Sequence, residues 1–175
     1  TSRFHGVGAD IPEAAVILGS DSDYNVVMKC TDQLEKFGLD YDMQVISAHR
    51  NPDQIFDYVR SAEDNGIEII IGAAGKAAHL PGIMAGLTTL PVIGIPIKTS
   101  FEGGLDSLLS IVQMPSGVPV ATVAVDGSQN AAILAAQILA LKYPELKKKL
   151  EDFKKQLNDE VVEKNRRLHA QLAED

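Results

Sequence analysis

Short apolar segments alternate with amphipathic segments along most of the chain, and this alternation restricts the possible folds more than any other feature. Strands are expected at the apolar runs, and helices where apolar residues recur every three or four positions. Strands that are apolar on both faces and alternate with helices are typical of a parallel sheet covered by helices on both sides. The expected strands are residues 14–18, 41–46, 67–71, 92–95 and 118–125, and the expected helices are residues 22–37, 51–65, 77–86, 105–112 and 128–141.

Five strand–helix units predict one doubly wound α/β domain over residues 14–143, which carries every candidate site residue. Residues 1–13 are interpreted as an N-terminal extension without the apolar core of a signal peptide. Residues 144–175 contain a further helix of about 20–25 residues, or about 30 Å, with one narrow apolar seam. We expect this helix to pack against another subunit, with folding back onto its own domain as the alternative. The seam consists of Leu146, Leu150, Phe153, Leu157 and Val161.

The charge distribution restricts the possible partners. The formal net charge of −8 lies entirely in residues 1–143, because residues 144–175 hold eight basic and eight acidic residues. An acidic chain with 5% aromatic residues and no tryptophan disfavours nucleic acid and anionic membranes. The sequence contains no run of 18 apolar residues, so no membrane span is predicted. The cytoplasm is the expected location. Three basic residues follow expected strands, which favours local attraction of an anion over chance placement: Arg50, Lys76 and Lys98.

Two turns have the composition of phosphate-binding loops. Gly-Ser-Asp-Ser-Asp at residues 19–23 and Ser-Ala-His-Arg-Asn-Pro at residues 47–52 each follow a strand and open a helix. Backbone N–H groups and the helix dipole at such a position attract an anion. In the first turn, glycine allows close approach, hydroxyls suit phosphate oxygens and a carboxylate suits sugar hydroxyls. The alternative is that Ser22 or Asp23 only caps the helix, while Asn51 caps the second one.

Two histidines extend this pattern. His49 can exchange a proton near neutral pH, and the neighbouring Arg50 suits forked phosphate contacts. A structural role is the alternative for His49. His79 lies among small residues at 75–82 that would let a flat ligand approach the backbone. The alternative is a tight strand-to-helix connection in which His79 only caps the helix or is exposed. These features predict an enzyme that acts on a phosphorylated small molecule.

Motifs for metals and common cofactors are not found. His5, His49, His79 and His169 have no paired ligand spacing, and Cys30 is the only cysteine, which also rules out an internal disulfide. No Gly-x-Gly-x-x-Gly or Walker-type loop is found. The residues by themselves therefore predict no metal site and neither of these two nucleotide-binding loops.

Four segments in order resemble one family, the N5-carboxyaminoimidazole ribonucleotide mutases, which are the small carboxylase subunits of purine biosynthesis. The resemblance runs from about residue 14 to the C-terminal helix. It implies a flavodoxin-like three-layer sandwich in a homo-octamer. It also implies an isomerase that moves a carboxylate from N5 to C4 of an aminoimidazole ribonucleotide without metal, ATP or cofactor. The segments are the two turns above, Ala-Ala-His-Leu-Pro-Gly at residues 77–82, and residues 105–120.

The resemblance also implies roles for individual residues. His49 would be the general acid and base of the reaction. Asp23 would contact the ribose. The 5′-phosphate would be held by Ser20, Ser22, Ser47 and Arg50, and the carboxylate and imidazole would be lined by Gly75, Ala77, Ala78, His79 and Leu80.

The runner-up function is a carboxylase of the same family that uses free carbon dioxide. Its typical members show a lysine after Ser-Ala-His and lack the 77–82 run, so Arg50 and the intact run favour a mutase. The chain departs from the mutase pattern at Asn51, where threonine is expected, and at Lys76, where glycine is expected. Lys98 also departs, and is interpreted as a surface residue.

Two further functions are considered for the same architecture. A flavin mononucleotide carrier would suit the first loop, but an aromatic residue is missing from the later strand-end loops. A phospho-acceptor receiver would need an aspartate at the end of the third strand, where Ala73 stands.

Overall fold

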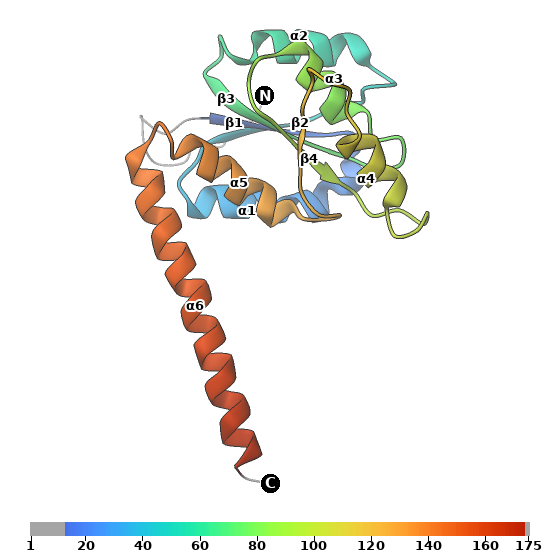
Figure 1. Ribbon diagram of the computed structural model, residues 1–175. Coiled ribbons are helices and arrows are strands. Elements are labelled where there is room, and N and C mark those ends of the chain that lie inside the picture. Colours follow the sequence, from blue (N-terminus) through green and yellow to red (C-terminus); the bar gives the residue numbers. More distant parts are fainter. Residues whose placement is uncertain (1–12, 174–175) are drawn as a thin grey trace.

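The computed structural model describes residues 13–173 and contains a five-stranded, all-parallel sheet (Figure 1). The strand order is β2-β1-β3-β4-β5, which is the order of flavodoxin-like folds. The predicted doubly wound α/β architecture is therefore confirmed. The strands are β1 (Glu13–Leu18), β2 (Tyr41–Val45), β3 (Ile67–Ala74), β4 (Val92–Pro96) and β5 (Ala121–Thr122).

Helices cover both faces of the sheet because successive residues of each buried strand point to opposite sides. In β1, Ala14, Val16 and Leu18 pack with one set of helices, while Ala15 and Ile17 pack with the other. The first face is covered by α1 (Tyr24–Lys36) and α5 (Ser128–Leu139), and the second by α2 (Pro52–Ala62), α3 (Leu80–Leu87) and α4 (Leu105–Val112) (Figure 1).

The position of β1 determines where a ligand can bind. The chain leaves β1 toward β2 on one side and returns through β3 on the other side. Connections that diverge in this way open a crevice beyond the carboxyl ends of the strands. The loops after β1, β2 and β3 therefore meet at one edge of the sheet.

The fifth strand is much shorter than predicted. The sequence predicts a strand over residues 118–125, but only Ala121–Thr122 form one. Pro119 has no N–H to donate to a ladder. Beyond the strand, single hydrogen bonds continue the contact with β4, from Val123 N to Gly94 O and from Asp126 N to Pro96 O. The rest of the segment is an irregular edge.

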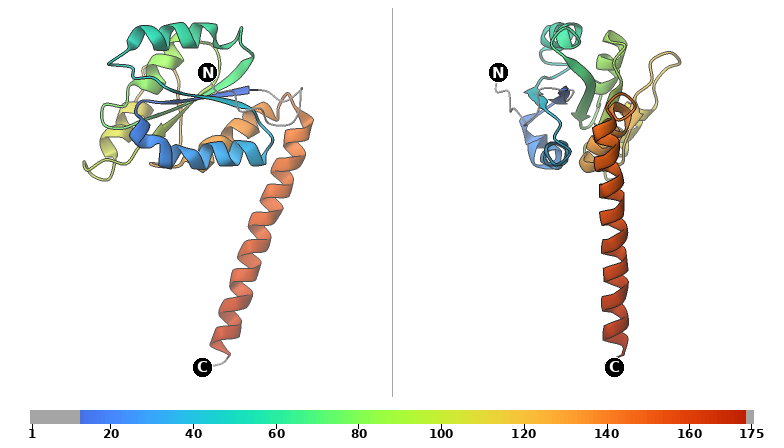
Figure 2. Two further views of the ribbon diagram at one scale, coloured as in Figure 1. Left: turned by 180° about the vertical axis from the view of Figure 1, so that it is seen from behind. Right: turned by 90° about the vertical axis from the view of Figure 1, so that its left-hand side faces the viewer.

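The last helix, α6 (Pro144–Leu172), has 29 residues and extends away from the domain (Figures 1 and 2). The predicted seam divides into two parts. Leu146 and Leu150 are buried on the helix's own domain, and the Phe153 ring packs edge-on against Phe37 at 5.6 Å. Thus the expectation that the whole seam faces another subunit is wrong for its first half. The second half is exposed at Leu157, Val161, Leu168 and Leu172.

Two expectations concern the ends of the chain and membranes. The predicted N-terminal extension, residues 1–13, lies outside the described residues except for residue 13. None of the helices in the described part of the chain is long and apolar enough to cross a membrane.

Close packing between β4 and α4 leads to a first prediction. A Cβ on Gly94 would meet Ile111 Cγ2 at 2.4 Å and Val120 Cγ1 at 3.1 Å. Gly94→Ala should lower the free energy of unfolding by about 1–3 kcal/mol, because overpacking forces neighbours to move. Urea denaturation measures this, with Gly86→Ala as the control because a Cβ on Gly86 has no heavy atom within 4 Å. Equal stability of both variants would contradict the packing described.

Candidate functional site

A cleft of about 660 Å³ lies where the loops after β1, β2, β3 and β4 meet. It has the size of a small-molecule site. Every site residue predicted from the sequence lines it except Ala78, which is buried in the core under α2 and α3. The predicted residues that line it are Ser20, Ser22, Asp23, Ser47, His49, Arg50, Gly75, Ala77, His79 and Leu80.

The loop after β1 presents two hydroxyls together. Ser20 Oγ and Ser22 Oγ are 2.8 Å apart, and Ser20 Oγ also accepts a hydrogen bond from Ser22 N. Ser20 therefore caps a short 3-10 turn at Asp21–Asp23 that precedes α1. Neither Ser22 nor Asp23 caps α1 through its side chain, so the alternative that one of them only caps this helix is wrong.

The loop after β2 is braced by its own side chains. Ser47 Oγ accepts hydrogen bonds from Arg50 N at 3.2 Å and from Arg50 Nε at 3.3 Å. Asn51 Oδ1 accepts from Ser47 N at 2.7 Å, so the expected side-chain cap of α2 by Asn51 does not form. Since a hydroxyl both accepts and donates, Ser47 keeps its own O–H for a ligand. Ser20, Ser47 and Arg50 also border an adjoining hollow of about 330 Å³.

Two histidines meet in the cleft. His49 Nε2 and His79 Nδ1 are 2.8 Å apart, with the rings nearly perpendicular at 82°. Exactly one proton must lie between these nitrogens for a hydrogen bond, so the tautomers of the two rings are linked. His79 stands at the N-cap position of α3, but its side chain makes no cap hydrogen bond. It contacts His49 instead, and both rings are exposed in the cleft.

Electrostatics distinguish Asp23 from ordinary surface carboxylates. Burial raises its pKa above the usual value, against the lowering effect of a hydrogen bond with Ser22. The nearby carboxylates of Asp126 and Asp21 raise the pKa further. The protein thus holds a half-buried, acceptor-rich group beside the first loop.

The end of β4 also contributes to the cleft. Lys98 was expected to follow a strand, where it would attract an anion, and was interpreted as a surface residue; it is exposed and lines the cleft. Sequence reasoning missed its neighbours Thr99 and Ser100, which line the same cleft. Lys98 N donates to Asp126 Oδ1 at 2.8 Å, and Thr99 Oγ1 donates to Asp106 Oδ1 at 2.7 Å. The rule that strand ends share one edge could have identified Thr99 and Ser100 as well.

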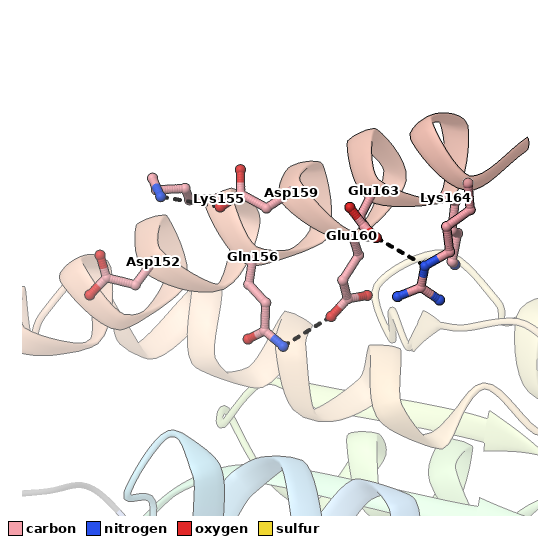
Figure 3. A pocket seen from close by; sticks show the side chains of 8 residues that line it. Asp152, Lys155, Gln156, Asp159, Glu160, Glu163 and Lys164 are labelled. Atoms are coloured by element: carbon pink, nitrogen blue, oxygen red, sulfur yellow. Dashed lines mark hydrogen bonds and ion pairs between the residues drawn. The ribbon is translucent and has the colours of Figure 1, made fainter. Parts of the chain in front are cut away.

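A second hollow, of about 770 Å³, lies along the outer part of α6 (Figure 3). Its lining side chains all come from this one helix and pair along it, for example Lys155 with Asp159 and Gln156 with Glu160. A hollow with a single wall cannot enclose a ligand, so we assign the chemistry to the cleft at the sheet edge. Within residues 13–173, no group of three or more His, Cys, Asp or Glu side chains could hold a metal ion.

The raised pKa of Asp23 leads to a pH-dependent prediction. Because the folded-state pKa lies above the unfolded-state value, ionisation of Asp23 costs stability as the pH rises through the folded-state pKa. Asp23→Asn should therefore be more stable than the wild type at pH 7. The gain should vanish below the unfolded-state pKa of about 3.9. Thermal unfolding at pH 7 and pH 3 tests this, with Asp32→Asn on the exposed side of α1 as control; a gain that is the same at both values contradicts it.

Comparison with known proteins identifies the family of the chain. The family model for AIR carboxylase matches residues 13–160. A protein of Thermotoga maritima named N5-carboxyaminoimidazole ribonucleotide mutase is 55% identical over 158 residues, which cover 90% of this chain and 92% of that protein. A protein of Pyrococcus horikoshii with the same name is 56% identical over 157 residues, covering 90% and 89%. A Schizosaccharomyces pombe protein named phosphoribosylaminoimidazole carboxylase is 49% identical over 153 residues, covering 87% of this chain but 28% of its own length.

A solved structure has a similar fold. Treponema denticola PurE superposes with a TM-score of 0.83 at 26% identity, covering 90% of this chain and 98% of that chain. The family resemblance expected from the four motifs is therefore confirmed over most of the described domain. The chain belongs to the AIR carboxylase family.

Proposed function

We propose that this protein converts N5-carboxyaminoimidazole ribonucleotide to 4-carboxy-5-aminoimidazole ribonucleotide, as an isomerase of purine biosynthesis. The observation that carries this function is the His49–His79 pair, which lies in a cleft whose β2 side presents Arg50. Relatives about 55% identical over nine-tenths of the chain are named as this mutase. A proton-exchanging group between an anion site and a small-residue loop is what the reaction needs.

In this proposal the phosphate binds at the β1 and β2 ends. Arg50 is held by Ser47, and the guanidinium keeps further N–H groups for phosphate oxygens. Ser20, Ser22 and Ser47 supply hydroxyls, and Asp23 accepts from the ribose. The loop at Gly75, Ala77, His79 and Leu80 then lies against the imidazole ring. Holding the phosphate anchors the reacting ring without taking part in bond changes.

The proposed chemistry uses one proton that His49 gives and takes back. The N5–carboxylate bond breaks, its electron pair stays on N5, and His49 protonates N5 to leave the amine and carbon dioxide. The electron-rich C4 then attacks the carbon dioxide and forms the new carbon–carbon bond. His49 finally removes the C4 proton, which restores the aromatic ring. Keeping carbon dioxide beside C4 is a proximity effect that depends on excluding water.

His79 orients His49 in this scheme. The 2.8 Å hydrogen bond couples the tautomer of His49 to that of His79 and holds the His49 ring in one orientation. In functional histidines, the hydrogen bond that one ring nitrogen makes commonly sets the protonation of the other. Because the chain supplies both rings, no added group is needed for the proton transfer.

Retention of carbon dioxide requires a cover that a single chain lacks, because His49 is exposed. Two apolar faces are available for contact with other copies. One is the outer part of α6. The other lies along α4 and the loop before it, and consists of Phe101, Leu105, Leu109 and Val112, each 40–60% exposed. We propose that these faces bury each other in a homo-octamer. The cytoplasm is the proposed compartment, as expected from the sequence.

The first test replaces the proposed acid and base. His49→Asn should lower kcat by at least about 100-fold, since general acid–base catalysis contributes about 10²–10⁴-fold. The assay follows isomerisation of the carbamate to the C4 acid. Asp32→Asn, on the exposed side of α1, is the control and should keep full activity.

Near wild-type turnover by His49→Asn would remove the catalytic assignment.

The same assay distinguishes the runner-up function, a carboxylase, which the name of the Schizosaccharomyces pombe relative favours. A mutase should convert the carbamate without bicarbonate. Turnover of only the uncarboxylated ribonucleotide, and only with bicarbonate, would establish the carboxylase instead.

The second test concerns assembly. Leu157→Glu with Val161→Glu places charges on the exposed half of the α6 seam, and sedimentation should then show a smaller species than the wild-type octamer. Lys155→Glu, about 200° round the helix from position 157, is the control and should leave the assembly intact. A wild-type protein that sediments as a monomer would end the octamer proposal.

A further inference from the structure

Lys76 combines a special backbone conformation with a place in the cleft. Its φ is +57°, in the left-handed region that residues with long side chains rarely adopt. Asp126 is also left-handed, but its side chain accepts a hydrogen bond from Lys98 N. No comparable side-chain bond accompanies Lys76 within the described residues. A left-handed residue of this kind at a ligand cleft indicates a functional constraint.

The backbone at this position is held from α4. Lys76 N donates to Ser107 Oγ at 2.9 Å, and Ser107 Oγ donates onward to Ile97 O at 2.8 Å. Ser107 is fully buried. Lys76 O accepts from Ala78 N at 2.9 Å. The loop is therefore fixed at both sides of Lys76, and the direction in which its side chain leaves the backbone is fixed with it.

The cations of the cleft are unpaired in the described part of the chain. Arg50, Lys76 and Lys98 form no ion pair there, although Asp23 lines the same cleft and Asp21 and Asp126 lie near it. Cations that line a cleft without carboxylate partners are available to an anionic ligand.

The cations are spread along the sheet edge. Arg50 follows β2 and Lys76 follows β3, and these strands flank β1, so the two strands that lead to these loops are about 10 Å apart across the sheet. The histidine pair joins the two loops, since His49 neighbours Arg50 and His79 follows Lys76 by three residues. A ligand that fills the cleft can thus place one anion at each loop, with the proton-exchanging group between them.

We propose that the Lys76 ammonium binds the carboxylate that the reaction moves, and so acts as a positioning and specificity residue. This inference rests on the proposed function, whose substrate carries a phosphate and a carboxylate at opposite ends. Arg50 and the serines take the phosphate. A lysine is a compact charge on a flexible stem, so one ammonium can follow the carboxylate from N5 to C4. Lys76 therefore favours both carboxylated ribonucleotides over the uncarboxylated one.

The test compares two ligands by calorimetry: 4-carboxy-5-aminoimidazole ribonucleotide and 5-aminoimidazole ribonucleotide. Lys76→Met should weaken binding of the carboxylated ligand about ten- to hundredfold, the effect of losing a charge-assisted hydrogen bond. Its binding of the uncarboxylated ligand should change less than about twofold on the same scale. Lys76→Arg should keep much of the preference, because it keeps the charge. Lys29→Met, an exposed lysine of α1, is the control.

Two further variants separate the possible failures. Arg50→Ala should weaken both ligands, because both carry the phosphate. Lys76→Gly should lose the preference as Lys76→Met does while unfolding at the same or a higher temperature, because glycine adopts positive φ without strain. That result separates loss of charge from loss of fold.

Each remaining outcome counts against a stated claim. An unchanged preference in Lys76→Met, or equal loss of both ligands, overturns the role of Lys76 and leaves the proposed function standing. Loss of the preference in Lys98→Met alone assigns the carboxylate to Lys98 and also overturns it. A wild-type protein that binds neither ribonucleotide overturns the proposed function, and the role of Lys76 with it.

Discussion

The pairing of β1 between β2 and β3 is the constraint on which the site depends. Leu18 is in register with Val45 on one side and with Ala73 on the other. The ladder continues just past the strands, from Gly19 N to Ala73 O at 3.0 Å and from Ile46 N to Leu18 O at 2.9 Å. All three chains therefore leave the sheet at one level. The three loops carry the hydroxyls, the guanidinium and the imidazoles. A small shift in strand register would therefore separate these groups.

Side chains that hydrogen-bond the backbone then stiffen each loop. Asn51 closes the β2 loop through Ser47 N, and Ser107 joins the β3 loop to the β4 end through Lys76 N and Ile97 O. Such bonds satisfy backbone groups that have no strand or helix partner. The result is a cleft with rigid walls and polar groups already in place, which lowers the cost of ordering a ligand. The exposure of His49 in this cleft is the reason why the proposed chemistry and the proposed assembly are linked.

Apolar periodicity was enough to predict the layers and the strand edge that carries the site, because these follow from local patterns and from the geometry of parallel sheets. The lining residues were predicted from the composition of the turns and from the family resemblance. The pattern failed where long-range contacts compete with local preference. Pro119 and the edge position shorten β5, and Asn51 bonds Ser47 rather than capping α2. The α6 seam looked uniform in sequence, yet only its first half meets the domain, since Leu146 and Leu150 lie near the sheet layers and Leu157 lies beyond them.

The chain's residue types and their order therefore specified the fold class, the candidate proton-exchanging residue His49 and its neighbour Arg50. Tertiary structure alone decided which side chains touch. It brought His79 to within 2.8 Å of His49 across 30 residues of sequence, excluded Ala78 from the cleft, and added Thr99 and Ser100 to it. The physical reason is that local periodicity specifies which face a residue takes, whereas the distance between two loops depends on sheet register and helix packing summed over the whole domain.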